Sequence, residues 1–227
     1  LFNLFNSMYW ALKASLLFLI ILLFTNNKIH SQVLESITDT RDGKTYKTIQ
    51  LGNQHWMAEN LAFDTPNSKC YKNNTTNCQT FGKLYNWETA NNVCPSGWHL
   101  PSKIEFDTLI NYLGGNEIAG AKIKSNLLWS TSYPSNYQKV VSCNHSDEEL
   151  EHDSIEINTS LFSALPGGGY YMGDVFDYLG IHACFWTSNE YNKYSGYYFN
   201  VYDKSTGAGI SNTQKNVYFS VRCLKNN

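Results

Sequence analysis

Two cysteine-bearing segments that lie far apart in the sequence constrain the fold most. The stretch CPSGWHLPSKIEFDTLINYLGG covers residues 94–115 and combines a cysteine, a tight turn and an amphipathic pattern. VRC, at residues 221–223, places another cysteine on what should be the last strand. Both cysteines flank strongly apolar segments, so we expect them to bond to each other. The pattern therefore predicts one domain that is closed by a bond between its early and late parts.

The first of these segments contains the clearest local signal, a helix over residues 103–113. Ser102 is followed three residues later by Glu105, which is the spacing of a capping box. The apolar residues then recur at the i, i+3, i+4, i+7 spacing of a helix with one core face: Phe106, Leu109, Ile110 and Leu113. Gly114 and Gly115 supply the stop. A second, shorter helix is predicted over residues 85–92.

Turn signals divide much of the remaining chain into strands. Residues 33–61 read as a β-meander with turns at Asp42-Gly43 and at Gly52-Asn53. Residues 62–80 are polar and rich in asparagine, so we expect a loop there. The chain from Phe162 onward is expected to be rich in strands. The three glycines at 167–169 predict a tight turn, because no Lys-Ser/Thr of a phosphate loop follows them.

The N-terminal segment has the pattern of a secretory signal. Residues 14–24 are an apolar run of eleven residues behind Lys13, and Ser31 is a suitable cleavage point. The run is shorter than the roughly 20 residues that a membrane span requires. We therefore expect a signal peptide over residues 1–31, with Met8 as an alternative start, and a single domain over residues 32–227. The alternative is an uncleaved anchor, which would be the domain's only link to a membrane.

Net charge and cysteine content limit the class of protein. The formal charge is −2 and only Arg41 and Arg222 are arginines, so we expect no nucleic-acid partner. The cysteines number six and all follow the apolar segment, which is typical of a disulfide-bonded exported protein. Six cysteines allow fifteen pairings. We expect Cys70–Cys78 around a polar loop, Cys94–Cys223, and Cys143–Cys184 from the two that remain. Free thiols or a metal site are the alternatives, although the sequence has no CxxC or HxH motif.

Several segments, in this order, resemble the Fibrobacter succinogenes major paralogous domain family. They are DGKTYKTIQLGNQHWMAENL, GKLYNWETA, CPSGWHLPSKIEFDTLINYLGG, FSALPGGGYY, FWTSNEY and FSVRC, and they extend from Asp39 to Cys223. The resemblance implies an exported bacterial protein, often on the cell surface, with no established general activity. It also implies the C-type lectin-like fold, which formylglycine-generating enzymes share. Cys184 departs from the family pattern, so its bond to Cys143 would be a local addition.

The resemblance and the helix and strand patterns together predict the architecture. We expect an α+β domain of C-type lectin-like type, in which two helices pack on a mainly antiparallel, twisted sheet held by disulfide bonds. Fold does not determine function, so the candidate sites must come from the residues.

Three stretches are candidate binding sites. Tyr198 and Tyr202 fall on one face of a predicted strand, where tyrosine rings can stack on a sugar or contact a protein. Asn189 and Glu190 follow a predicted core strand and carry oxygen atoms that suit calcium. The acidic stretch at 145–153 is a further calcium candidate, although it lacks the spacing of an EF-hand. No cofactor is expected apart from this calcium.

Catalytic patterns are weak in this sequence. It contains no Gly-x-Ser-x-Gly motif, and three disulfides would leave no cysteine pair to bind copper. We therefore expect a non-catalytic domain, secreted or on the bacterial cell surface, that recognises a glycan or a protein ligand. The alternatives are a structural component of the cell envelope, or an oxidase or hydrolase on a scaffold like that of the formylglycine-generating enzymes.

Overall fold

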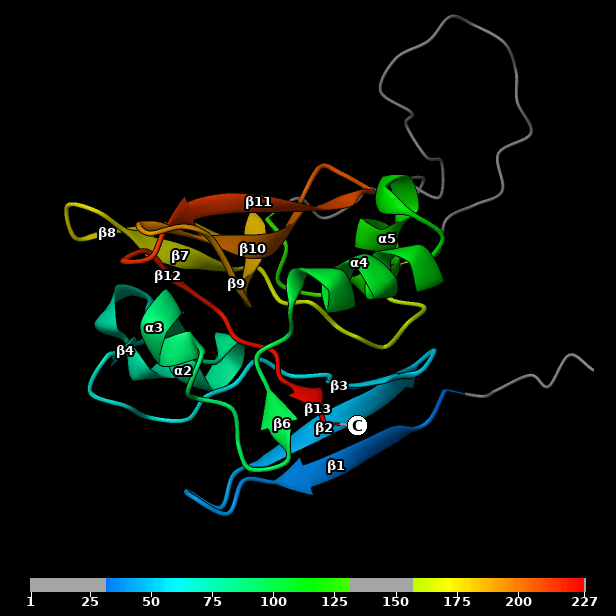
Figure 1. Ribbon diagram of the computed structural model, residues 1–227, viewed down its shortest axis with the longest axis horizontal. Helices are drawn as coiled ribbons and strands as arrows, with labels where there is room; N and C mark the ends of the chain where they lie inside the picture. The colour runs from blue at the N-terminus through cyan, green and yellow to red at the C-terminus, as the bar shows by residue number, and fades with distance from the viewer. Residues whose placement is uncertain (1–31, 131–156, 227) are drawn as a thin grey trace, which may run out of the picture. The chain divides into compact units, whose positions relative to one another are not determined.

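The computed structural model describes residues 32–130 and 157–226 (Figure 1). Within these residues the strands form three sheets, and every pair of neighbouring strands is antiparallel. The strands are β1 (Leu34–Thr38), β2 (Thr45–Leu51), β3 (Gln54–Met57), β4 (Ser68–Lys69), β5 (Leu84–Asn86), β6 (Trp98–His99), β7 (Gly167–Tyr171), β8 (Val175–Leu179), β9 (His182–Asn192), β10 (Ser195–Tyr202), β11 (Ala208–Gln214), β12 (Tyr218–Phe219) and β13 (Leu224–Lys225). The helices are η1 (Tyr71–Asn73), α2 (Thr75–Phe81), α3 (Trp87–Ala90), α4 (Lys103–Tyr112) and α5 (Asn116–Ile123). The predicted α+β class with mainly antiparallel sheets is confirmed.

The first sheet joins the beginning and the end of the described chain. Its strand order is β1-β2-β3-β13-β6, so the last strand lies between β3 and β6. Leu224 is opposite both Trp56 and His99. The Cys94–Cys223 disulfide, with 5.8 Å between its Cα atoms, fixes the same junction. The predicted closure of early on late residues is confirmed, and so are the turns of the predicted meander.

A buried carboxylate supports the turn between β1 and β2. The Asp39 side chain is 0% exposed and accepts hydrogen bonds from Arg41 Nε (2.9 Å) and Nη2 (2.6 Å). Arg41 Nη2 also donates to the carbonyl of Val93 at 2.8 Å, which links this turn to the segment before the long disulfide. The hydrogen bond from Arg41 lowers the pKa of Asp39 below its ordinary value.

Asp39→Asn is expected to lower the free energy of unfolding by about 1–2 kcal/mol at neutral pH, discounted for the partial exposure of Arg41. Because the pKa of Asp39 is lower in the folded state, its contribution is complete above the unfolded pKa of about 4. It is lost as the pH falls through the folded pKa. Urea unfolding of both proteins along a pH series measures the difference. A difference that stays constant into strong acid would contradict this assignment.

Helix α4 forms as its sequence predicts. Both halves of the capping box are present: Glu105 N–H donates to Ser102 Oγ at 3.3 Å, and Ser102 N–H donates to Glu105 Oε2 at 2.7 Å. The helix ends at Tyr112, with Leu113 as its cap. The Phe106 ring stacks on Phe199 of β10 with centroids 4.6 Å apart, and this contact seats the helix on the sheet β11-β10-β9.

The other helices differ from the prediction. The helix predicted over residues 85–92 is a single turn, α3, because Leu84–Asn86 forms β5 and pairs with β12. The Asn86 side chain accepts from the Thr89 N–H at 2.9 Å and so begins α3. The predicted loop at 62–80 contains α2, which Asn74 caps in the same way. Helix α5 was not predicted.

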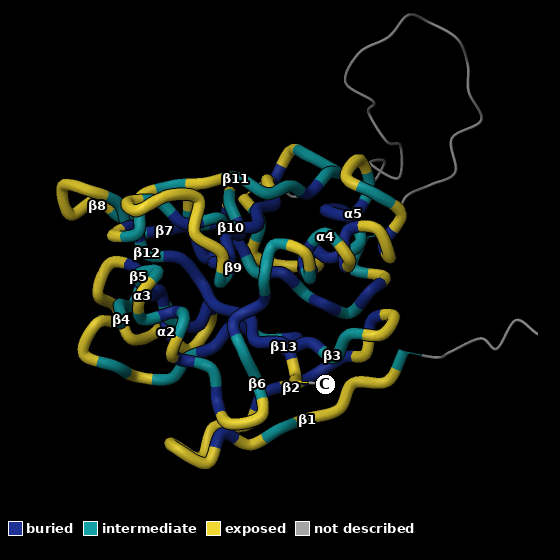
Figure 2. Tube along the Cα trace, viewed as in Figure 1, coloured by how far each residue is buried: buried dark blue, intermediate teal, exposed yellow. Residues whose placement is uncertain are grey.

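Strands β9 and β10 contribute side chains to two hydrophobic cores. Figure 2 shows where the described chain is buried. On one face, Phe185, Phe199 and Val201 join the core that contains α4 and α5. On the other face, Cys184 and Trp186 are buried in the second core. The alternation of side chains along these two strands therefore decides which residues reach each core and which face solvent.

Candidate functional site

The register of β9 and β10 brings His182 and Tyr202 together at one end of the sheet. Tyr202 is directly opposite His182, and their rings meet edge to face with centroids 4.3 Å apart. Asn200 is opposite Cys184 and Tyr198 is opposite Trp186, so this face becomes more buried along the strands. At this end of the pair, His182 and Tyr202 remain partly exposed to solvent.

Tyr178 from β8 completes this aromatic group. Its ring stacks on His182 with centroids 4.3 Å apart and 4° between the planes. The two residues flank a turn in which the Ile181 N–H donates to the Tyr178 carbonyl at 3.0 Å. Tyr178 is 39% exposed and Tyr202 is 38% exposed. We call Tyr178, His182 and Tyr202 the aromatic cluster.

The backbone holds Tyr178 in a conformation that bulky residues rarely adopt. Its φ is +64°, in the left-handed region. Gly168 of β7 lies directly against this segment, because a Cβ atom there would come within 2.4 Å of the Asp177 carbonyl oxygen. The three glycines at 167–169 therefore form strand β7 and not the predicted tight turn. Strain of this kind is concentrated at functional sites, which makes Tyr178 a candidate.

The aromatic cluster combines ring faces with hydroxyl groups. Burial lowers the pKa of His182, so its imidazole is neutral at neutral pH and can donate or accept a hydrogen bond. Burial raises the pKa of Tyr202, so its hydroxyl stays protonated. Partly exposed aromatic rings beside such hydrogen-bonding groups suit a ligand that has an apolar face and a polar rim.

Tyr198 is placed on the predicted face of β10 but lies deeper than Tyr202. Its ring packs on Phe219 with centroids 4.8 Å apart and on Trp186 at 6.3 Å. Burial raises the pKa of Tyr198 to about 12. Because the Tyr198 ring packs on both of these core residues, an alanine there would also remove part of the second core.

The structure gives Asn189 and Glu190 stabilising contacts. Asn189 Oδ1 accepts a hydrogen bond from the Lys103 N–H at 2.7 Å, at the start of α4. Glu190 pairs with Lys215, whose ammonium lies 4.3 Å from the centre of the Trp87 ring. Within residues 32–130 and 157–226 no three His, Cys, Asp or Glu side chains gather as a metal site would require. The acidic stretch at 145–153 lies outside the described residues.

The cysteines confirm two of the predicted bonds and correct the third. Cys70–Cys78 and Cys94–Cys223 are formed. Cys184 is a free thiol near the start of β9, enclosed by the second core, and burial raises its pKa to about 12. The predicted Cys143–Cys184 bond is therefore absent from the structure, and Cys143 itself lies outside the described residues. Pairing by elimination failed because it takes no account of burial.

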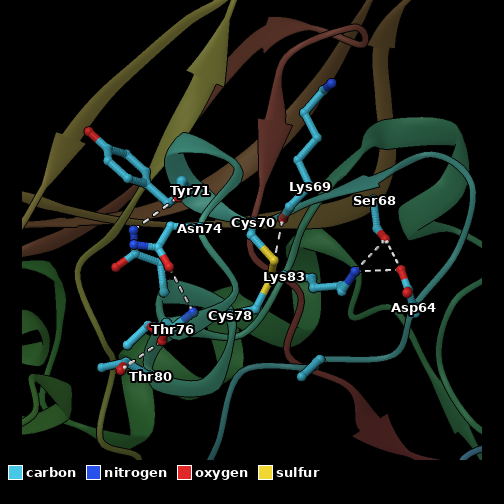
Figure 3. The surroundings of a disulfide bond; sticks show 12 residues. Asp64, Ser68, Lys69, Cys70, Tyr71, Asn74, Thr76, Cys78, Thr80 and Lys83 are labelled. Carbon is cyan, nitrogen blue, oxygen red and sulfur yellow. Dashed lines mark hydrogen bonds and ion pairs between the residues drawn. A yellow bond between two sulfur atoms is a disulfide. The ribbon is translucent and has the colours of Figure 1, made fainter.

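A cavity of about 390 Å³ lies beside the Cys70–Cys78 disulfide, and Cys78, Lys44 and Lys83 are among the residues that line it. Its lysines are already paired: Lys44 with Asp42 at 3.2 Å, and Lys83 with Asp64. Figure 3 shows the ammonium of Lys83 held between Asp64 and Ser68. Because both lysine ammonium groups already have carboxylate partners, they are less available to a ligand than the hydrogen-bonding groups of the aromatic cluster.

Sequence reasoning found Tyr202 but missed Tyr178 and His182. The sequence signal that could have identified them is the short turn around Gly180. This turn joins β8 to β9 and so brings the residues on either side of it together. None of the described helices is both long and apolar enough to cross a membrane.

Comparison with known proteins identifies the family. The profile of the Fibrobacter succinogenes major domain matches residues 49–225, which is most of the chain. No curated protein and no solved structure matches. The matched region contains the aromatic cluster, both disulfides and the junction between β3, β13 and β6. The chain therefore belongs to the Fibrobacter succinogenes major domain family.

Proposed function

We propose that this protein is a non-catalytic binding domain that recognises a glycan through the aromatic cluster. The observation that carries the proposal is the exposed, strained Tyr178 stacked on His182, with Tyr202 at its edge. Sugar rings present apolar C–H faces and a rim of hydroxyls, which match aromatic faces and adjacent hydrogen-bonding groups. A protein ligand with an exposed aromatic or aliphatic residue is the alternative partner.

The same proposal includes a C-type lectin-like fold and an exported location, secreted or at the bacterial cell surface. The closure of β13 between β3 and β6 and the long disulfide support the fold. Two disulfides support export, because such bonds persist in oxidising compartments. The apolar segment at 14–24 adds to the argument for export.

The state of Cys184 favours binding over oxidase chemistry. A reactive cysteine needs an accessible thiolate. The Cys184 thiol is buried, and burial raises its pKa to about 12, so it stays protonated and inert at neutral pH. The other four cysteines of the described chain are used in disulfides.

Tyr202→Ala and Tyr178→Ala are expected to weaken glycan binding by at least about tenfold, or about 1.4 kcal/mol. The measurement is binding of the purified protein to an array of oligosaccharides, with calcium and again with a chelator, followed by affinity titration of the ligands found. Thermal unfolding should change little, because both rings are partly exposed. Tyr198→Phe, which keeps the core packing, should have a smaller effect than either alanine variant.

Tyr194→Ala is the matched control, because Tyr194 is 72% exposed and lies between β9 and β10 at their other end. It should bind as the wild type does. Equal loss in Tyr194→Ala and Tyr202→Ala would contradict the assignment of the site. Binding that disappears in chelator would instead direct attention to calcium.

A further inference from the structure

A second aromatic group lies on the opposite face of the β7–β8 hairpin. Consecutive residues of β7 point to opposite sides, so Tyr170 and Tyr171 enter different surroundings. Tyr171 contacts Tyr178 and packs toward the second core. Tyr170 contacts Phe176 and Tyr218 instead. The hairpin therefore presents an aromatic group on each face.

The group on this face is a row across three neighbouring strands. Tyr218 of β12 is directly opposite Tyr170 of β7, which is directly opposite Phe176 of β8. The ring centroids are 5.3 Å apart in the first pair and 4.8 Å apart in the second. All three side chains are partly exposed. We call Tyr218, Tyr170 and Phe176 the tyrosine row.

Lys69 places a positive charge over this row. Its ammonium lies 4.4 Å from the centre of the Tyr170 ring and 5.2 Å from that of Tyr218. Within the part of the chain that the structure describes, Lys69 forms no ion pair with a carboxylate. Ring faces attract the cation but do not accept its N–H groups as a carboxylate would, so its three donors remain available.

The short disulfide fixes the position of Lys69. Lys69 ends β4 immediately before Cys70, and the bond from Cys70 to Cys78 ties this point to α2. Figure 3 shows the Lys69 side chain extending away from the disulfide. The charge is therefore held on an anchored element, which lowers the entropy lost when a ligand binds.

We propose that Lys69 and the tyrosine row form a second binding site, for a sugar that carries a carboxylate, namely a hexuronate. The ring faces contact the apolar side of the sugar, and the ammonium pairs with its carboxylate. The Tyr170 hydroxyl donates a hydrogen bond to Asp174, so the carboxylate of Asp174 places a negative charge at the hydroxyl end of that ring. The carboxylate of the ligand therefore lies on the Lys69 side of the row. This site does not depend on the aromatic cluster.

The test is calorimetric titration of the purified protein with tetragalacturonate and with its fully methyl-esterified form, which keeps the sugar but removes the charge. The wild type should bind the acid at least about tenfold more tightly than the ester. Lys69→Met, which keeps the aliphatic stem, should remove this preference. Lys47→Met makes the same change of charge at an exposed lysine on β2 and should leave binding unchanged.

Asp174→Asn should bind the acid at least as tightly as the wild type, because it removes a nearby negative charge. A loss of binding in Asp174→Asn would overturn the anion assignment. Three other results would also overturn the anion assignment. They are equal affinity for acid and ester, no binding of tetragalacturonate, and full competition by equimolar sulfate at constant ionic strength. Tyr202→Ala should keep acid binding, and Lys69→Met should keep the binding of neutral glycans. These two variants therefore show whether a negative result concerns the second binding site or the aromatic cluster.

Discussion

Replacing Cys94 and Cys223 together with alanine is expected to lower the free energy of unfolding by about 4–5 kcal/mol. The bond joins residues that are 129 positions apart, so it restricts the unfolded chain strongly. It also holds β13 in the first sheet, between β3 and β6. Urea unfolding without reductant measures the change. We expect the midpoint to fall sharply, with the variant close to unfolding at 37 °C.

Replacing Cys70 and Cys78 with alanine is the matched control. This bond closes only 8 positions, and the same chain-entropy relation gives about 2.6 kcal/mol. Reductant should bring the unfolding midpoints of the wild type and the Cys94/Cys223 variant together, since the long bond is then absent from both. A larger loss from the short bond than from the long one would contradict the view that the long bond closes the domain.

Arg222→Met is expected to lower the free energy of unfolding by about 3–5 kcal/mol. The Arg222 side chain is completely buried and donates to Asn60 Oδ1 at 2.8 Å and to the Ser163 carbonyl at 2.7 Å. It also donates to the Phe162 carbonyl. Methionine fills a similar volume but leaves these three acceptors without their donor. Burial lowers the pKa of the guanidinium to about 9, which still leaves it charged at neutral pH.

Arg41→Met supplies the comparison, because Arg41 is the other arginine of the chain and its side chain is 30% exposed. Its loss should cost about 1–2 kcal/mol, because removing this partly exposed side chain opens Asp39 to solvent and Asp39 keeps its hydrogen bond from the Arg41 backbone N–H. Guanidinium unfolding of both variants gives the two values. If Arg222→Met were no more destabilising than Arg41→Met, the buried network around Arg222 would not be a main determinant of the fold.

Local signals predicted the elements that depend on neighbouring residues. The capping box and apolar periodicity of α4 act within a few turns of helix, and the Asp42-Gly43 turn needs only its own positive φ, +74° at Gly43. Such elements were read correctly. The long disulfide was also predicted, because its cysteines stand in the two most distinctive apolar segments.

Elements that depend on distant partners were misread. Residues 84–86 have a helical pattern, but pairing with β12 draws them into a strand and shortens the helix to α3. The three glycines at 167–169 belong to β7, which pairs with β8, and the chain at 177–179 approaches Gly168 too closely for a side chain there. Neither contact leaves a signal within the local sequence.

The candidate site also combines a residue that a local pattern identified with residues that depend on distant partners. Strand periodicity identified Tyr202, and Phe199 and Val201 lie on the opposite face of β10, in the first core. Tyr178 and His182 were not predicted, because their stack depends on the left-handed backbone of Tyr178 and on the register of β9 with β10. The tertiary structure, and not the composition, brings the residues of the aromatic cluster together on one surface.

The most direct test of the glycan-binding account is an NMR titration of the isotopically labelled protein with the tightest ligand from the oligosaccharide array. The account predicts that the largest amide shifts will occur from Tyr178 to His182 and around Tyr202, with saturation at the affinity found by the titration of that ligand. Shifts confined to other parts of the surface, or the absence of any array ligand, would contradict it.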